Sequence, residues 1–294
     1  MRVAVVINPV SGPRARADTG AARRAEAARA LARLGVEHSL ALTEYPGHAR
    51  QLAAEAVSAG VERVIAWGGD GTINEVASAL AWSGIALGIV RSGSGNGLAN
   101  ELGVPHRPVE AFARALACRP RAIDLGEING RLFVNVAGIG FDARIAHRFN
   151  ALRGRSHGLR TYVREVVDEL RAYAPSRFTL ATDDQRVEID ALIVVFANAP
   201  QYGNHARICP TARLDDGKLD AVAVRSRGAL RDLWRARRLF TGSVLRDPGV
   251  WHRQIDHAVV GTAAATPYHV DGEPCDAAST FVVRVRPLAL RVCA

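Results

Sequence analysis

The stretch that decides the fold covers residues 63–80 and reads RVIAWGGDGTINEVASAL. It starts as a short apolar run, passes through the turn GGDGT, and continues with apolar residues at helical spacing. Glycines let a backbone approach a polyphosphate closely, and the first amides of a helix attract anions. Asp70 can also hold a magnesium ion through water. The stretch predicts a strand, a phosphate-binding turn and a helix, whereas a simple Asp-Gly helix cap explains only one or two of its residues.

Similar turns follow the neighbouring strand candidates. SGSGNGLANEL (92–102) comes after one apolar run and opens a second helix, Asn8-Pro9-Val10-Ser11-Gly12 ends the first run, and Thr43 follows another. The carboxyl ends of parallel strands meet at one edge of a sheet, where ligands bind. We therefore expect these turns to face one nucleotide.

The first part of the chain alternates apolar runs with helix-periodic runs, which is typical of a parallel sheet with crossover helices. The pattern predicts strands at 3–7, 36–42, 63–67 and 86–90. It predicts alanine-rich helices at 19–34, 47–59 and 72–81. Residues 1–122 are thus expected to form an α/β domain.

From residue 123 the pattern changes to IDLGEI, the hairpin-favouring dipeptide Asn129-Gly130, and RLFVNVAG. Helices are expected at 141–149 and 158–173, and strands at 177–181, 187–196, 219–224, 254–261 and 280–285. Residues 123–286 therefore read as an antiparallel, β-rich second domain. A length of 294 residues fits two domains.

The apolar runs, the net charge and the cysteines indicate where the protein is located, what it binds and which kinds of site it lacks. The first residues do not resemble a secretory signal and the longest apolar run, 191–199, is too short to span a bilayer, so a cytoplasmic location is expected. The net charge of +9 should attract a nucleotide, a nucleic acid or acidic lipid headgroups. The arginine-rich segments 151–171 and 228–246 fit either a solvated helix face or a lipid-binding surface. The four cysteines form no CxxC or Cys/His pattern, so neither a zinc site nor a disulfide framework is predicted.

Other phosphate chemistries lack their motifs: the sequence has no GxxxxGK[ST], no HRD or DFG, and no GxGxxG at a strand end. Asp271 and Glu273 place two carboxylates on one turn, where one could take a proton from an acceptor hydroxyl, although the residues alone favour a plain surface turn. Asp215-Asp216-Gly217 is a common turn that could also hold a hard cation.

Taken together, these motifs resemble the diacylglycerol kinase catalytic-domain family. Asn8-Pro9-x-Ser11-Gly12, GGDGTINEV and GSGNGLA follow one another in the family's order, and IDLGEINGRLFVNVAGIGFDA, CPTARLDDGKLDAV and VDGEP look like its later segments. The resemblance implies a nucleotide-binding domain of the Rossmann or NAD kinase type, a β-sandwich domain, and residues 287–294 returning to the first domain. ATP and Mg²⁺ are the implied cofactors, and a membrane-lipid hydroxyl is the implied acceptor.

Residue roles implied by this resemblance are carried over by motif. Asp271 would be the general base with Glu273 beside it, and Asp216 with the backbone carbonyls of Arg213 and Lys218 would bind a structural magnesium. The residues implied to contact the nucleotide are Asn8, Thr43, Gly68, Gly69, Asp70, Gly71, Thr72, Ile73, Asn74 and Ser94. The loop Ser94-Gly95-Asn96-Gly97 lacks an acid that many bacterial members carry, and looks closer to the sphingosine and ceramide kinase branch.

We therefore expect an ATP-dependent lipid kinase that binds anionic membrane peripherally at the inner membrane surface. One alternative is an NAD kinase-type enzyme, which shares GGDGT but not GSGNGLA or VDGE. A second is a non-catalytic nucleotide- or lipid-binding regulator, against which stands the presence of Asp70, Asp271 and Glu273. Nucleic acid is not expected as a partner, since no recognition helix stands out. A homodimer stays open.

Overall fold

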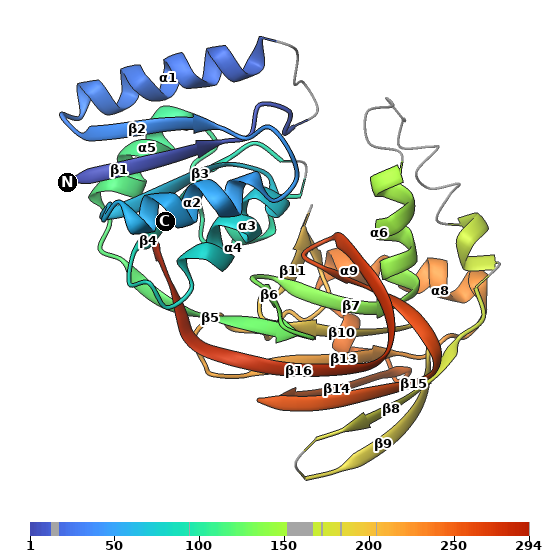
Figure 1. The fold of residues 1–294 in the computed structure, drawn as a ribbon. Helices are drawn as coiled ribbons and strands as arrows, with labels where there is room; N and C mark the ends of the chain where they lie inside the picture. Colours follow the sequence, from blue (N-terminus) through green and yellow to red (C-terminus); the bar gives the residue numbers. More distant parts are fainter. Residues whose placement is uncertain are drawn as a thin grey trace. The chain divides into compact units, whose positions relative to one another are not determined.

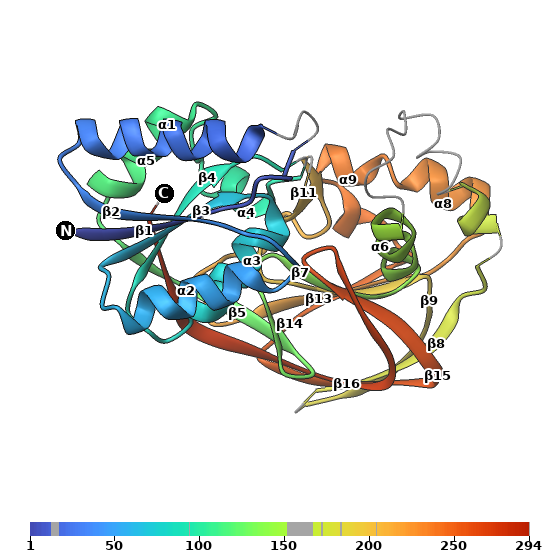
Figure 2. The ribbon, with the colours of Figure 1, turned by 45° about the horizontal axis from the view of Figure 1, so that its top comes forward.

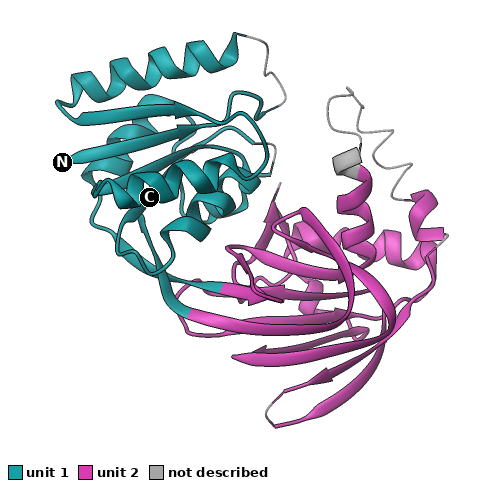
Figure 3. Cartoon of the chain, viewed as in Figure 1, with its two compact units in different colours: residues 1–125, 287–294 teal, residues 126–286 magenta. Residues whose placement is uncertain are grey.

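The computed structural model describes residues 1–12, 18–93, 95–151, 167–171, 173–182, 184–203 and 205–293. The chain forms two compact units, shown in different colours in Figure 3. Unit 1 comprises Met1–Leu125 and Pro287–Ala294, and unit 2 comprises Gly126–Arg286. In the described part of the chain, no helix is both long and apolar enough to cross a membrane.

Unit 1 contains a parallel sheet in the order β4-β3-β1-β2. Its strands are β1 (Arg2–Ile7), β2 (Glu37–Leu42), β3 (Arg63–Gly68) and β4 (Ala86–Arg91). The inner strands are buried on both faces, which explains why they read as continuous apolar runs. The last residues of β16 (Glu273–Cys293) add a parallel strand beside β4.

Helices cover both faces of this sheet. The helices are α1 (Thr19–Arg33), α2 (His48–Ser58), α3 (Asp70–Leu80), α4 (Gly97–Glu101) and α5 (Pro108–Ala117). Figures 1 and 2 show α1 and α5 together on one face, and α2 and α3 together on the other. The sequence pattern missed α5, although its proline at the first turn and its buried Ala111, Phe112 and Ala115 mark an amphipathic helix.

Unit 2 is built mainly from antiparallel strands, in the order β14-β13-β10-β7-β15-β16, with β8 and β9 continuing from β15. The strands are β5 (Arg121–Ile128), β6 (Arg131–Phe133), β7 (Val136–Gly140), β8 (Ser176–Ala181), β9 (Arg186–Ala191), β10 (Ile193–Ala197), β11 (Gln201–Gly203), β12 (Ala206–Arg207), β13 (Leu219–Val224), β14 (Val250–Ile255), β15 (His257–Val270) and β16. An α/β domain followed by a β-rich domain confirms the predicted fold class.

Two predicted strands of unit 2 are each two strands in the structure. The run 187–196 breaks at Leu192 into β9 and β10, and the run 254–261 breaks at Asp256 into β14 and β15. Each run has strand-forming residues on both sides of its break, so periodicity alone does not reveal a change of partner strand. The buried faces of these strands meet in a core that contains Phe133, Phe178, Phe196 and Phe281.

Helices of unit 2 lie outside this core. They are α6 (Phe141–Ala151), α8 (Ala229–Arg235), α9 (Arg238–Thr241) and the short 3-10 helix η1 (Val244–Arg246). Of the helix predicted at 158–173, residues 158–166 and 172 lie outside the described residues, and residues 167–171 are helical.

Candidate active site

The turns that follow β1, β3 and β4 are joined to one another by side chains. Asn8 Nδ2 donates to Thr72 Oγ1 at 2.9 Å, and the hydroxyls of Ser11 and Ser92 lie 2.6 Å apart. The N–H of Ser92 donates to the carbonyl of Gly68 at 3.0 Å. The predicted gathering of turns at one sheet edge is therefore present in the structure.

Two glycines bring the turn after β3 and the turn after β4 into direct contact. A Cβ built on Gly69 would lie 3.1 Å from the Cα of Gly93, and a Cβ on Gly93 would lie 2.7 Å from the Cα of Gly69. Gly68 is restricted as well, since its Cβ would lie 2.4 Å from the Cβ of Thr72. Side chains at these positions would push the two backbones apart, so the glycines keep them at contact distance.

Asp70 connects the turn after β3 to the turn after β4 by hydrogen bonds. Its Oδ2 accepts the N–H of Asn96 at 2.8 Å, and its Oδ1 accepts the N–H of Gly97 at 2.7 Å. Asn96 lies in the left-handed region with φ of 51°, and its Oδ1 accepts the N–H of Gly93 at 2.9 Å. In this structure the Asp70 carboxylate holds backbone amides, a role that the sequence did not predict.

Arg23 of α1 is a site residue that the sequence analysis missed. Its guanidinium donates to Ser11 Oγ and to the Ser11 carbonyl, both at 2.8 Å, and lies over the Trp67 ring at 5.7 Å. Burial lowers its pKa below the usual arginine value. Arginines are frequent in α1, so nothing in the local sequence marks Arg23 as the residue that contacts the turn after β1.

The other predicted nucleotide contacts that the structure describes occupy the same edge of unit 1. Gly71, Thr72, Ile73 and Asn74 lie in the first turns of α3, where Ile73 is buried against the sheet. Thr43 follows β2, and its N–H donates to the carbonyl of Ile7 at 2.9 Å. Ser94 lies outside the described residues.

Unit 2 contains the two predicted catalytic carboxylates, Asp271 and Glu273. Asp271 lies in a tight turn between β15 and β16 with φ of 48°, and its N–H donates to the carbonyl of Val136 at 2.9 Å. Its Oδ2 accepts the N–H of Val134 at 2.7 Å, and its Oδ1 accepts those of Asn135 and Val136 at 2.8 and 2.9 Å. Three backbone donors stabilise a carboxylate charge and fix the turn against the chain before β7.

A buried histidine supports this turn from behind. His269 Nδ1 accepts the N–H of Gly272 at 3.2 Å, which leaves Nε2 to donate to Asp142 Oδ2 at 3.2 Å. The Tyr202 hydroxyl donates to the same oxygen at 3.1 Å. Burial, followed by the Asp142 charge, raises the pKa of Tyr202 well above its usual value, so the phenol keeps its proton. None of these three residues was predicted, because they come from separate parts of the chain.

Glu273 occupies a different environment from Asp271. It is the first residue of β16, opposite Val270 in the register, and its side chain is partly exposed. Glu273 and Asp271 flank Gly272, so the two predicted catalytic carboxylates do share one turn. They differ in that Asp271 is occupied by backbone donors.

The predicted metal loop is compact. Asp216 Oδ1 accepts the N–H of Lys218 at 3.1 Å, Asp216 Oδ2 accepts Gln254 Nε2 at 3.3 Å, and Arg213 pairs with Asp215 at 3.5 Å. These contacts place Asp216 at the centre of the loop, between the residues whose carbonyls the family resemblance assigns to magnesium.

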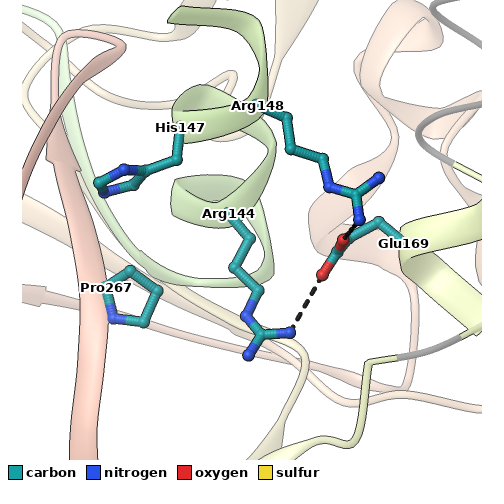
Figure 4. A pocket seen from close by; sticks show the side chains of 5 residues that line it. All are labelled: Arg144, His147, Arg148, Glu169 and Pro267. Carbon is teal, nitrogen blue, oxygen red and sulfur yellow. Dashed lines mark hydrogen bonds and ion pairs between the residues drawn. The ribbon is translucent and has the colours of Figure 1, made fainter. Parts of the chain in front are cut away.

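One pocket of unit 2 has a basic lining, which Figure 4 shows from close by. It is open, has a volume of about 330 Å³, and is lined by Arg144, His147, Arg148, Glu169 and Pro267. Arg144 and Arg148 both pair with Glu169, at 3.0 and 2.7 Å. The buried Glu169 carboxylate therefore offsets one of the two guanidinium charges that line this pocket.

Comparison with known proteins assigns both halves of the chain. Residues 2–128 match the model of the diacylglycerol kinase catalytic domain, and residues 135–294 match that of the YegS C-terminal NAD kinase beta sandwich-like domain. A probable lipid kinase YegS-like protein of Chromohalobacter salexigens is 33% identical over 78% of this chain and 75% of its own length. A diacylglycerol kinase of Mycobacterium tuberculosis is 33% identical over 92% of this chain and 85% of its own length.

Solved structures agree on the fold. The crystal structure of a diacylglycerol kinase from Bacillus anthracis superposes with a TM-score of 0.72 at 20% identity, covering 99% of this chain and 96% of the other. The two domain matches and the relatives of similar length lead to one assignment. The chain belongs to the family of diacylglycerol kinases and YegS-like lipid kinases.

Proposed function

We propose that the protein transfers the γ-phosphoryl group of ATP to the hydroxyl of a membrane lipid. The observation that carries this proposal is the contact between Gly69 and Gly93, which packs two glycine-rich turns against each other at the edge of the sheet. Family membership makes the chain a phosphotransferase, and the lipid names of its relatives suggest the acceptor class.

The nucleotide would bind at the turns of unit 1. The first-turn amides of α3 have no intrahelical acceptor, so the amides of residues 70–72 would donate to phosphate oxygens. Thr72, Asn74, Thr43 and Ser94 would contribute side-chain contacts. Bound Mg²⁺ would neutralise developing charge on the phosphates. A second Mg²⁺, held by Asp216 and the carbonyls of Arg213 and Lys218, would stiffen its loop.

The proton acceptor would lie on the turn of Asp271 and Glu273. Both are candidates, and the backbone contacts of Asp271 lead us to propose Glu273. At least three of the four lone-pair positions of Asp271 are occupied by backbone N–H groups, which lowers its tendency to take a proton. Glu273 would accept the proton of the lipid hydroxyl as that oxygen attacks phosphorus. Asp271, supported by His269, would fix the direction of Glu273.

The acceptor lipid would be reached through a surface on α8 and α9, which we name the arginine–aromatic surface. Its apolar members are strongly exposed: Leu230 at 78%, Trp234 at 56% and Phe240 at 67%. Leu230 and Trp234 are four residues apart and share a helix face. Exposed arginines surround them at positions 227, 231, 237 and 246, and Arg237 lies 3.4 Å from the Trp234 ring centroid.

This combination fits an anionic bilayer. Tryptophan and phenylalanine insert at the level of the headgroups, and each nearby arginine adds about 1 kcal/mol of attraction to acidic lipids. Not every arginine of the segment takes part: Arg235 is buried between Asp232 and Asp247, at 2.9 and 2.7 Å, and holds α8 to η1. The enzyme would thus associate peripherally with the inner membrane surface.

Trp234→Ala combined with Phe240→Ala should weaken binding to vesicles that contain phosphatidylglycerol by at least about tenfold, because two inserting rings are lost. Sedimentation with vesicles measures this effect. Trp82→Ala is the matched control, since Trp82 is 63% exposed but belongs to unit 1. Equal vesicle binding by the double variant and the control would remove this surface from the membrane role.

The proposed activity is tested with a total lipid extract. The purified chain, ATP and Mg²⁺ are incubated with the extract in vesicles, and mass spectrometry detects lipids that gain a phosphate. We expect one class of lipid to be phosphorylated. A parallel reaction contains NAD in place of lipid: formation of NADP without any phosphorylated lipid would contradict the proposal and favour the NAD kinase-type alternative.

A further inference from the structure

Three side chains that commonly bind metals converge in unit 2, and none of them belongs to the Asp271 turn. They are Cys209, Asp220 and His252, whose candidate ligand atoms all lie within 4.8 Å of one another. His252 Nε2 is 2.5 Å from Asp220 Oδ1 and 3.8 Å from Cys209 Sγ. Among the described residues, no other group of three such side chains is this close.

The fold explains the convergence. β13 and β14 are antiparallel, and Val222 pairs with His252 in their register. Asp220 is two residues from Val222, so Asp220 and His252 are diagonal neighbours on one face of the sheet. Cys209 belongs to the segment that crosses this face, where it packs with Val136, Val195 and other apolar side chains. The sequence analysis saw no zinc pattern because the ligands are 32 and 43 positions from His252.

The geometry does not suit a nucleophilic triad. In such a triad the acid and the nucleophile contact opposite nitrogens of the imidazole ring. Here Asp220 and Cys209 both approach Nε2, and Cys209 is 0% exposed, so no substrate reaches its sulfur. Three ligand atoms within 4.8 Å of one another are an arrangement that can hold a cation.

A positive charge is already needed at this spot. Asp220 is 2% exposed, and a buried carboxylate is costly unless a cation compensates it. In the chain without metal, a proton on His252 supplies that charge, and the hydrogen bond to Asp220 raises the pKa of His252 to about 9. This ion pair accounts for two of the three residues, and the Cys209 sulfur lies beside it, 3.8 Å from His252 Nε2 and 3.3 Å from Thr211 Oγ1.

We propose that Cys209 Sγ, Asp220 Oδ1 and His252 Nε2 bind a zinc ion, with water as the fourth ligand. Thiolate, imidazole and carboxylate are the ligand types of zinc, at about 2.0–2.3 Å. Small side-chain rotations would bring the three atoms to tetrahedral spacing. The thiol proton and the His252 proton leave to solvent as the two bonds to zinc form. His252, whose side chain is 29% exposed, provides the route of entry.

Zinc at this position would act on structure. It would connect the segment that begins at Cys209 to β13 and β14, immediately before the loop of Asp216. That segment is otherwise attached by weaker contacts, such as the N–H of Cys209 to the carbonyl of Pro200 at 3.4 Å. Binding should therefore raise the unfolding temperature of the chain.

The test uses the full chain without a histidine tag, treated with a chelator and dialysed. Isothermal titration with Zn²⁺ alone should show one equivalent bound per chain, and the unfolding temperature should rise. Co²⁺ in place of Zn²⁺ should give a thiolate-to-cobalt absorption band. Absence of that band, or no high-affinity equivalent of Zn²⁺, would overturn the proposal, and neither readout depends on kinase activity.

Variants separate this site from its neighbours. Cys209→Ser and His252→Gln should each weaken Zn²⁺ binding by at least about 100-fold. Cys118→Ser and Asp216→Asn are the matched controls, one for thiols in general and one for the neighbouring loop, and both should bind Zn²⁺ normally. Unchanged affinity in the Cys209 and His252 variants would also overturn the proposal. If a variant does not fold, the cobalt band of the unmodified chain still decides.

Discussion

Glu273→Gln is expected to lower turnover by about 10²–10⁴-fold, the usual contribution of a general base, with little change in nucleotide affinity or unfolding temperature. The amide has the size of the carboxylate but cannot accept the proton of the lipid hydroxyl. Glu273 is partly exposed at the start of β16, so the amide can occupy the place of the carboxylate without a change in packing. Initial rates with saturating lipid, ATP affinity and thermal unfolding are measured on the same preparation.

Asp271→Asn is compared with Glu273→Gln, because the two variants together show which carboxylate is the general base. An asparagine has one acceptor oxygen, so its NH₂ group would face at least one of the three backbone N–H groups that now contact Asp271. A buried unsatisfied donor costs about 1–3 kcal/mol, so this variant should lose both stability and turnover. If instead Asp271→Asn unfolds normally without turnover, and Glu273→Gln stays active, the base is Asp271.

Local features of the site could be predicted from the sequence. The strand, glycine turn and helix at 63–80 are encoded by neighbouring residues, and the structure places β3 at Arg63–Gly68 and α3 at Asp70–Leu80. The position of the turns at one sheet edge followed from the parallel arrangement alone. The α/β and β-rich halves were likewise visible as a change from helical to alternating periodicity.

Long-range contacts could not be predicted in the same way. Nothing near Asp70 in the sequence indicates that its oxygens accept the N–H groups of Asn96 and Gly97, from a turn 26 and 27 positions away. His269 and Asp142 meet across 127 positions. Such pairs depend on strand register, which a single sequence without aligned relatives does not specify. The cluster of Cys209, Asp220 and His252 is invisible for the same reason.

The residues of the glycine turns have two different roles: some join the turns by hydrogen bonds, and others allow the backbones to approach each other. Asn8, Ser11, Arg23 and Asp70 hold the turns to one another, and their hydrogen bonds are already made without nucleotide. Gly69 and Gly93 contribute by lacking a side chain, which allows the two turns to touch. Preformed turns of this kind bind phosphate without an ordering cost, because the backbone amides are already directed. Substituting a glycine and substituting a holding residue should therefore have different effects.

Gly69→Val is expected to abolish nucleotide binding. Even the Cβ of an alanine at this position would lie 3.1 Å from the Cα of Gly93, and the branched side chain of valine reaches further into the space that the phosphates require. Backbone atoms cannot give way as a flexible side chain would, so the two turns must separate. Titration with a fluorescent ATP analogue should show at least about a 100-fold loss of affinity, which corresponds to about 2.7 kcal/mol.

Gly69→Ala and Gly261→Ala complete the series. Gly69→Ala should give an intermediate loss, since the contact with Gly93 is tight without being impossible. Gly261→Ala is the matched control, because a Cβ there meets its nearest neighbour, Thr179, at an ordinary 4.0 Å. Gly69→Val and Gly69→Ala should retain the unfolding transition of unit 2, because Gly69 and Gly93 both lie in unit 1. Normal ATP affinity in Gly69→Val would show that the nucleotide does not use this turn.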